Sequence, residues 1–410
     1  MADRCPISNL YKSLNERNIE YFLLSNFEEF DPNGDIDLYV PIENKDEFLK
    51  VMAELGWYKR KEPAIQKYKC FYYYLDSDKV IYLDVKYKLY FMDKDKQTFI
   101  YSKSYQNIYK NIKRTEFSAW RPSGPDALHL YLGHLFYEKK VIKDKHIERL
   151  KEYLEKYHLE LSEREKKELE HVLIILREKN GFDEPTTSYI QRWFKYLKNE
   201  NQHLRKRSFS YGYKVLVLGT DGTGKSSLIK NIRKEIPVKT KSIYLGTGED
   251  GWELKQVKKM NKNFQGPILG RLLKTIILPI EFCLRVIRGK VNAKYKLILI
   301  DRFPGWAIIS KNKLRNYIYK IILPKPDLVI FLHGDPQILF ERKKERSVES
   351  ISKDTLKFKS VAHRVCNNVL EINTTELNER ETTKVVIDYI VKEKKFRYLL
   401  FEELRSIGDE

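Results

Sequence analysis

The stretch KVLVLGTDGTGKSS, residues 214–227, decides the fold of this chain. Its apolar run at 215–218 has the composition of a buried strand, and a helical pattern covers 227–235. Between them, residues 219–226 match G-x-x-x-x-G-K-[ST]. Such a loop binds the phosphates of a nucleotide through backbone N–H groups and the positive end of the following helix. The spacing therefore predicts a nucleotide-binding loop between a strand and a helix.

The loop residues have separate expected roles around a bound nucleotide triphosphate and its Mg²⁺ ion. Lys225 is expected to reach the β- and γ-phosphates, and the hydroxyl of Ser226 is expected to bind Mg²⁺. The other residues expected to contact the nucleotide are Gly219, Gly222, Thr223, Gly224 and Ser227. A glycine-rich turn without a ligand is the alternative, and the full match in a strand–helix context disfavours it.

Length and composition indicate a chain with several folded domains. Its 410 residues are enough for two or three domains. A hydrophobic share of 42% beside 33% charged residues favours folded cores over disorder. The four cysteines are scattered without a C-x-x-C pair, and residues 1–10 lack the apolar core of a signal peptide. We therefore expect a cytoplasmic protein without a zinc site.

The net charge of +20, from 77 Lys and Arg against 57 Asp and Glu, favours polyanionic partners. Nucleotides, phosphorylated glycans, nucleic acids and anionic membrane surfaces all fit this charge. Because the lysines are spread along the chain, dedicated nucleic-acid binding is not favoured. A nucleotide triphosphate is the first partner expected, and attachment to the inner face of a membrane is a further option.

Residues 1–121 have the pattern of an α+β domain with three acids on neighbouring strands. Helices are predicted at 7–18 and 45–55, and strands at 21–24, 35–40, 67–75 and 80–87. Asp35 and Asp37 point the same way, because strand side chains repeat every two residues, and Asp84 lies in the apolar strand IYLDV. Three such carboxylates can hold two Mg²⁺ ions that bind a triphosphate. Exposed acids at a sheet edge are the alternative.

This segment resembles the nucleotidyltransferase superfamily. The family's order of motifs is followed by LLSN at 23–26, GDIDL at 34–38 and LDV at 83–85. The resemblance implies nucleotidyl transfer with Asp35, Asp37 and Asp84 as catalytic metal ligands. The chain departs from the family at Ser25-Asn26, where Gly-Ser or Gly-Gly usually stands in the loop that holds the triphosphate.

A helical extension, a linker and a second domain follow. Residues 122–205 show helical patterns at 127–139, 145–157, 162–179 and 187–197, and the polar, basic stretch 199–213 is the best linker. From 206 to 410, strands alternate with helices, the pattern of a parallel α/β sandwich built on the phosphate-binding loop. Strands are predicted at 214–218, 242–245, 296–300, 328–332 and 369–372, and helices at 225–236, within 266–289, at 336–346 and at 382–394.

Two further charged motifs of the second domain fit phosphoryl transfer. Asp301 ends an apolar strand, where an acid orients Mg²⁺ or its water, and Arg302 can grip a phosphate or carboxylate through two hydrogen bonds. Arg342 and Arg346 are expected on one face of a single helix, where they can neutralise charge on the transferred group. A structural salt bridge and a solvated helix end are the respective alternatives.

Together these motifs resemble the thymidylate kinase-like branch of the P-loop nucleoside monophosphate kinases. The glycine loop, D-R-F, P-D-L and an arginine-rich lid stand in the family's order, at 219–226, 301–303, 326–328 and 342–346. The resemblance implies that the loop holds MgATP, that an acid and a base position the acceptor, and that the last arginines form a lid. The residues to which it gives catalytic roles are Lys225, Asp221, Asp301, Arg302, Arg342 and Arg346.

Two departures from that family concern the acceptor. The chain after Phe303 lacks the Ser…Ala-Tyr-Gln segment with which thymidylate kinases read thymine, and residues 246–251 lack their R-E-P-G segment. Thymidylate is therefore not the expected acceptor. Relatives of this pattern resemble proteins of bacterial capsule and O-antigen synthesis, which suggests a sugar or glycan, with a nucleotide as the other class. The segment 268–287 is mostly apolar but is interrupted by charged residues, so it is expected as a core helix, with a membrane-surface helix as the alternative. A homodimer is a further option for the chain.

The sequence leaves three interpretations of the whole chain open. The first is a kinase for a non-thymidylate acceptor, joined to a nucleotidyltransferase-like domain. In the second, the N-terminal domain carries the chemistry and the P-loop domain senses a nucleotide. In the third, both sites are degenerate and the chain is a nucleic-acid-binding or assembly factor.

Overall fold

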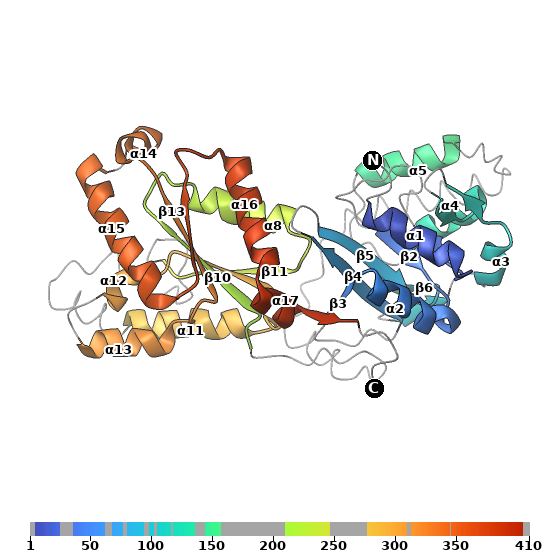
Figure 1. Ribbon diagram of the computed structural model, residues 1–410, viewed down its shortest axis with the longest axis horizontal. Coiled ribbons are helices and arrows are strands. Elements are labelled where there is room, and N and C mark those ends of the chain that lie inside the picture. Colours follow the sequence, from blue (N-terminus) through green and yellow to red (C-terminus); the bar gives the residue numbers. More distant parts are fainter. Residues whose placement is uncertain are drawn as a thin grey trace, which may run out of the picture.

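The computed structural model has two halves, each built on its own β-sheet (Figure 1). It describes residues 5–24, 36–61, 68–76, 80–93, 98–101, 105–115, 118–135, 144–156, 210–246, 277–309, 313–344 and 346–404. The expected loop at Ser25-Asn26, Asp35, the helical patterns at 162–179 and 187–197, and most of the linker lie outside these residues. Within them, no helix is long and apolar enough to cross a membrane.

The N-terminal half contains a six-stranded mixed sheet covered by helices. The strand order is β1 (Phe22–Leu23), β2 (Ile36–Tyr39), β5 (Val80–Lys86), β4 (Lys69–Leu75), β3 (Tyr58–Arg60) and β15 (Phe401–Glu403). Only the β2–β5 pair is parallel. The other elements of this half are α1 (Pro6–Glu16), η2 (Ile42–Asn44), α2 (Lys45–Glu54), β6 (Tyr90–Asp93), β7 (Thr98–Tyr101), α3 (Tyr105–Tyr109), β8 (Lys113–Arg114), β9 (Trp120–Arg121), α4 (Gly124–Gly133) and α5 (Asp144–Lys156).

The alternation of side chains along β4 divides them between two cores. Tyr72 packs with α1 and α2, and its ring meets that of Phe48 at 5.9 Å. Phe71 and Tyr73 point to the other face of the sheet and join a core that includes strands of the C-terminal half. Successive residues of a strand point to opposite faces, so this one aromatic strand contributes to both cores.

The C-terminal half is a parallel sheet with helices on both faces. The strand order is β11 (Thr240–Tyr244), β12 (Leu297–Asp301), β10 (Tyr213–Gly219), β13 (Leu328–His333) and β14 (Val369–Asn373). One face packs against α8 (Lys225–Glu235) and α16 (Glu379–Lys392), and the other against α11 (Leu278–Lys290), α13 (Lys313–Ile322) and α15 (Val348–Val365) (Figure 1). The remaining helices are α12 (Gly305–Ile308), α14 (Pro336–Arg342) and α17 (Lys394–Leu400). The three central strands, β12, β10 and β13, are buried on both faces, which explains their continuous apolar runs.

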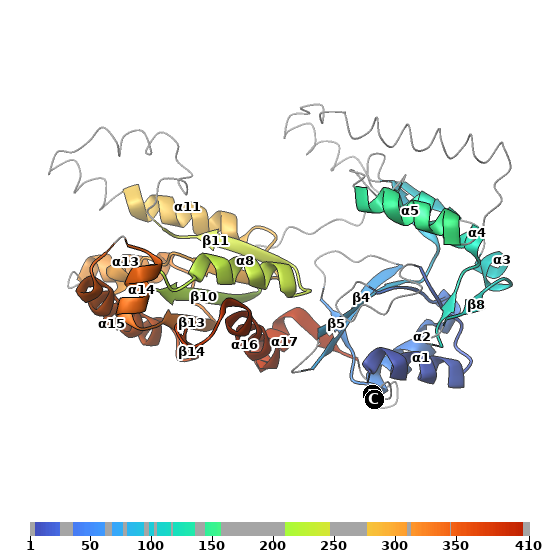
Figure 2. The same ribbon diagram turned by 90° about the horizontal axis from the view of Figure 1, so that it is seen from above.

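The end of the chain joins the two halves. Figure 2 shows α17 and the strand after it lying between the two sheets. This strand, β15, pairs antiparallel with β3 at the edge of the N-terminal sheet. Phe401 is 3% exposed and contacts Tyr73 with a ring separation of 5.0 Å, and the Tyr73 hydroxyl donates to the carbonyl of Pro237 at 2.9 Å. The two halves therefore share a hydrophobic core.

The predicted strands agree with the structure within about two residues. The predicted helix at 336–346 begins at Pro336 as expected but is too long, because α14 ends at Arg342 and the backbone of Lys343 is extended. The hydroxyl of Ser347 then caps a separate helix, α15, which the sequence did not predict. The division at 206 remains a prediction, although β15 lies in the N-terminal sheet.

Candidate phosphate-binding site

The glycine loop lies at the carboxyl edge of the parallel sheet, between β10 and α8. Gly222 and Gly224 have φ values of 87° and 79°, a conformation that strains residues with a side chain. A Cβ atom on Gly222 would also lie 2.8 Å from the carbonyl oxygen of Leu339. The order of strands reverses at β10, which is where open α/β sheets bind ligands. The loop thus has the position and shape of an anion cradle.

Lys225 is the buried cation of this cradle. It is 8% exposed, and its ammonium group donates to the carbonyl oxygen of Thr220 at 2.6 Å. Burial, reinforced by the nearby charge of Arg302, lowers the pKa of Lys225 to about 8. The hydroxyls of Ser226 and Ser227 are exposed in the first turn of α8, where an anion or a hydrated cation can reach them.

Asp301 fits a cation ligand at the end of β12. This strand pairs with β10, and Asp301 stands opposite Val217, two residues before the loop. Its Oδ1 atom is buried without a hydrogen-bond partner among the described residues. Burial also raises the pKa of this carboxyl group. A buried carboxylate oxygen without a partner is costly, so a bound Mg²⁺ or its water would satisfy this atom.

Arg302 and Asp221 extend this charged cluster towards solvent. Arg302 has a φ of 58°, uncommon for a residue with a side chain, and its guanidinium donates to Asp221 Oδ1 at 3.3 Å. Arg346 lies 3.5 Å from the other oxygen of Asp221. Burial alone would raise the pKa of Asp221, but the surrounding cations, Lys225 and Arg302 foremost, outweigh burial and the pKa is lowered. Asp221 is therefore a carboxylate that holds two arginines beside the loop.

Arg342 and Arg346 do not share a helix face, so that prediction is wrong. Arg342 ends α14 and donates to the carbonyl oxygen of Thr374 at 3.0 Å. Arg346 follows the helix and pairs with Asp221 and Asp354. Because the chain leaves the helix between them, the two arginines reach different polar partners. Both still lie around the loop, on different sides of it.

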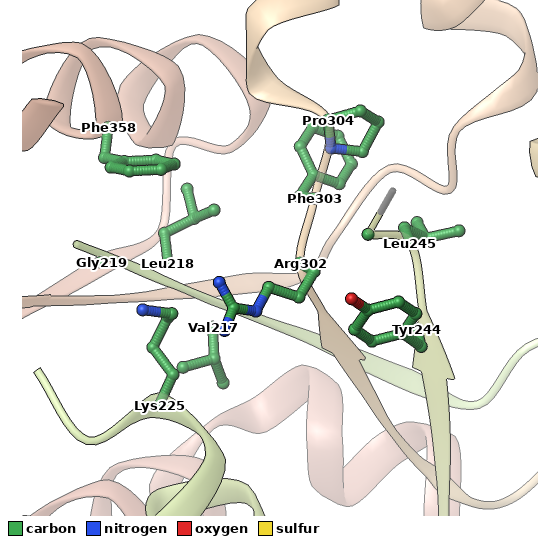
Figure 3. Close-up of a pocket in the computed structure, with 11 residues that line it drawn as sticks. Val217, Leu218, Gly219, Lys225, Tyr244, Leu245, Arg302, Phe303, Pro304 and Phe358 are labelled. Carbon is green, nitrogen blue, oxygen red and sulfur yellow. The ribbon is translucent and has the colours of Figure 1, made fainter. Parts of the chain in front are cut away.

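A cavity of about 360 Å³ opens on the Arg302 side of the loop. Figure 3 shows Lys225 and Tyr244 on opposite sides of the Arg302 side chain, with Phe303 beside Pro304 above it and Phe358 on the side away from Tyr244. Sequence reasoning missed Tyr244 and Phe358 as site residues. Phe358 belongs to the unpredicted helix α15, and no motif marks it.

A second cavity of about 290 Å³ opens on the other side of the loop. It is lined by the glycine loop, Arg342, Thr374 and residues that begin α16. Asn378 caps that helix and accepts hydrogen bonds from the backbone N–H groups of Arg380 and Glu381. The glycine loop therefore separates two cavities, each with an arginine at its wall.

In the N-terminal half, Asp37 and Asp84 stand opposite each other on the parallel strands β2 and β5. Asp84 is 8% exposed, and its Oδ2 lies 2.5 Å from the ammonium of Lys69. Burial raises the pKa of Asp84 to about 6, although Lys69 acts in the opposite direction. The third predicted ligand, Asp35, lies outside the described residues, and within them no three His, Cys, Asp or Glu side chains form a metal cluster.

No protein-family model and no curated protein matches the chain. Solved structures are similar to part of it. The YorR protein from Bacillus subtilis, in complex with phosphorylated GDP, is 16% identical, with a TM-score of 0.29, covering 43% of this chain and 95% of that one. Deoxyadenosine kinase from M. mycoides, with dCMP and dCDP, is 16% identical, with a TM-score of 0.31, covering 43% and 98%.

Thymidylate kinase from Candida albicans is 18% identical, with a TM-score of 0.32, covering 45% of this chain and 94% of that one. At these identities and TM-scores, the likenesses support no conclusion about activity or substrate. The function proposed next depends on the geometry around the glycine loop.

Proposed function

We propose that the C-terminal half is an ATP-dependent phosphotransferase. The observation that carries this proposal is a glycine loop with a buried lysine, flanked by one cavity on each side. A triphosphate held by the loop would have its nucleoside in one cavity and its terminal phosphate towards the other. A loop that only sensed a nucleotide would need the first cavity alone.

The cavity beside Arg342 is the better fit for the donor nucleoside. It is continuous with the first turn of α8, and Arg342 is held at its wall by the carbonyl of Thr374. The cavity beside Arg302 then receives the acceptor. It contains a guanidinium for an anionic group and the rings of Tyr244, Phe303 and Phe358 for a flat or apolar face.

In the proposed reaction, an acceptor oxygen forms a bond to the γ-phosphorus of ATP while the in-line bond from that phosphorus to the β–γ bridging oxygen breaks, and ADP leaves with the bonding electrons. A Mg²⁺ ion held by Ser226 and Asp301 would supply charge neutralisation on the phosphates. Lys225 stabilises the γ-phosphate during transfer, and Arg302 orients the acceptor. Arg346, held by Asp221, adds positive charge at the open side of the site. Positioning and electrostatic stabilisation are the main sources of rate acceleration in such a reaction.

The acceptor is proposed to be a molecule other than thymidylate that carries a ring and an anionic group. A phosphorylated sugar or glycan of bacterial surface polysaccharide synthesis fits this description, and so does a nucleotide. A volume of about 360 Å³ is at the small end for ligand sites, which favours a single ring system over an extended chain.

The test is transfer of label from γ-labelled ATP to sugar phosphates, nucleotides and a cell extract, followed by identification of the product. Lys225→Ala should lower transfer by about a hundredfold or more. Lys230→Ala, an exposed lysine on the same helix, should leave it unchanged. If no pool acquires label, or if Lys225→Ala transfers label as well as the wild type, the proposal is wrong.

A second candidate activity is nucleotidyl transfer in the N-terminal half. The alignment of Asp37 with Asp84 on adjacent strands favours it, because two carboxylates on one face can share a metal ion. Transfer of label from α-labelled triphosphates, lost in the Asp37→Ala and Asp84→Ala variants, would support this activity. A chain that binds RNA in a salt-sensitive manner and transfers neither label would instead be a binding factor.

A further inference from the structure

An ion pair in α11 is buried directly behind the wall of the acceptor cavity. Glu281 is 0% exposed and Arg285 is 5% exposed. The Nε atom of Arg285 lies 2.7 Å from Oε1 of Glu281, one helical turn away. Neither residue lines the cavity, and neither belongs to any motif noted in the sequence.

Stability alone does not account for this pair. Taking two charges out of water is costly, and an apolar pair of similar volume is often at least as stabilising. On the same buried face of α11, Phe282 and Val286 pack into an apolar core, and the Phe282 ring lies 5.6 Å from the Arg285 guanidinium, so an apolar solution was available to this helix. A specific role for the guanidinium group is therefore the better explanation.

The guanidinium holds the backbone at the end of β11. Its Nη1 atom donates to the carbonyl oxygen of Gly246 at 2.7 Å and lies 3.3 Å from that of Tyr244. Between these residues, the N–H of Leu245 donates to the carbonyl oxygen of Asp301 at 2.8 Å. The segment 244–246 is thus held by the sheet on one side and by Arg285 on the other.

This segment forms the cavity wall next to Arg302. A Cβ atom on Gly246 would lie 2.4 Å from the Tyr244 hydroxyl and 2.8 Å from Cβ of Arg302. The Arg285 guanidinium also lies 5.9 Å from the centre of the Tyr244 ring. Such close packing means that a small shift of the backbone would move Tyr244 against Arg302.

We propose that Arg285, oriented by Glu281, is a positioning residue that sets the shape of the acceptor cavity and so the fit of the acceptor. The role of Arg285 in acceptor fit rests on the proposed phosphotransfer. Its hydrogen bonding to the backbone of residues 244–246 does not depend on that proposal. Lysine cannot replace it, because a single ammonium lacks the planar fork that binds a carboxylate and two carbonyls together.

The first test is hydrogen exchange of the full-length Arg285→Lys variant without any ligand. The amide of Leu245 should exchange about tenfold faster or more, because the adjacent backbone loses its hydrogen bonds to the guanidinium. The amides of β13 should be unchanged. Glu281→Gln should show a smaller change at the same amide, and Arg288→Lys, on the exposed side of α11, none.

The second test is titration calorimetry with two probes, uridine monophosphate and glucose 1-phosphate, and separately with MgATP. A probe that binds the wild type should bind Arg285→Lys about tenfold more weakly, while the MgATP affinity changes by less than about twofold. Equal losses for probe and MgATP, or unchanged exchange at Leu245 in both Arg285→Lys and Glu281→Gln, would overturn the proposal. If neither probe binds the wild type, the proposed acceptor classes fail, and exchange at Leu245 decides the role of Arg285.

Discussion

Replacement of Phe401 by alanine tests whether the two halves of the chain share one core. Phe401 is 3% exposed, and its ring lies 5.0 Å from Tyr73, 5.8 Å from Phe396 and 6.5 Å from Tyr58. A buried Phe→Ala change costs about 3–5 kcal/mol, and each aromatic pair adds about 0.5–1.5 kcal/mol beyond area burial. With three ring partners, we expect the free energy of unfolding to fall by about 4 kcal/mol.

The measurement is urea denaturation combined with hydrogen exchange of β3 and β4. Because β15 pairs with β3, the loss should appear as faster exchange in strands more than three hundred residues earlier in the sequence. Glu402→Ala on the same strand is the control, since this side chain is exposed and its ion pair with Lys59 is worth at most about 1 kcal/mol. The reasoning is refuted if Phe401→Ala leaves exchange in β3 and β4 at the level of the control.

Three further predictions concern the phosphate-binding site. Because the pKa of Lys225 is lowered to about 8, this lysine is mostly neutral at about pH 9, and ATP binding there should take up close to one proton. Calorimetry in buffers of different ionisation enthalpy detects this uptake. Uptake that persists in Lys225→Ala would contradict the prediction. Gly222→Ala should abolish tight ATP binding while the sheet stays folded, because the methyl group meets the Leu339 carbonyl; near-normal affinity by calorimetry would show that the loop does not need this glycine. Arg302→Gly should raise the free energy of unfolding by about 1 kcal/mol, because glycine adopts the positive φ of this position without strain. The same change should lower label transfer. A loss of stability in urea would disprove the backbone strain assigned to Arg302.

Much of the parallel sheet could be predicted because its three central strands, β12, β10 and β13, are apolar on both faces. A run such as Leu297–Asp301 is buried on every side but its end, so composition alone identifies it. The glycine loop could also be predicted from the sequence, because the positive φ values at Gly222 and Gly224 permit few residues other than glycine. Asp301 and Arg302 followed from their place at the end of a strand next to that loop.

Other parts of the site depend on partners that are distant in the sequence. Arg346 leaves its expected helix because Asp221 and Asp354 bind it and Ser347 starts a new helix. The carbonyl oxygen of Tyr244, at the cavity wall, accepts a hydrogen bond from Arg285 of α11, a residue that no sequence motif marks. Local sequence patterns do not record contacts of this kind.

The sequence by itself determined the glycine loop and the apolar strands around it, and it predicted Asp35, Asp37 and Asp84 as a set of acids on neighbouring strands. The loop and each single strand depend on residues within about ten positions of one another, where periodicity and glycine spacing carry the information, whereas the alignment of Asp37 with Asp84 depends on strand pairing. Only the tertiary structure decided that β15 completes the N-terminal sheet and that both halves share a core. Hydrophobic burial is non-directional and does not depend on how far apart two residues are in the sequence. The three-residue strand β15 pairs with β3 because its shape and its free backbone groups match that sheet edge. No local sequence pattern specifies such a pairing.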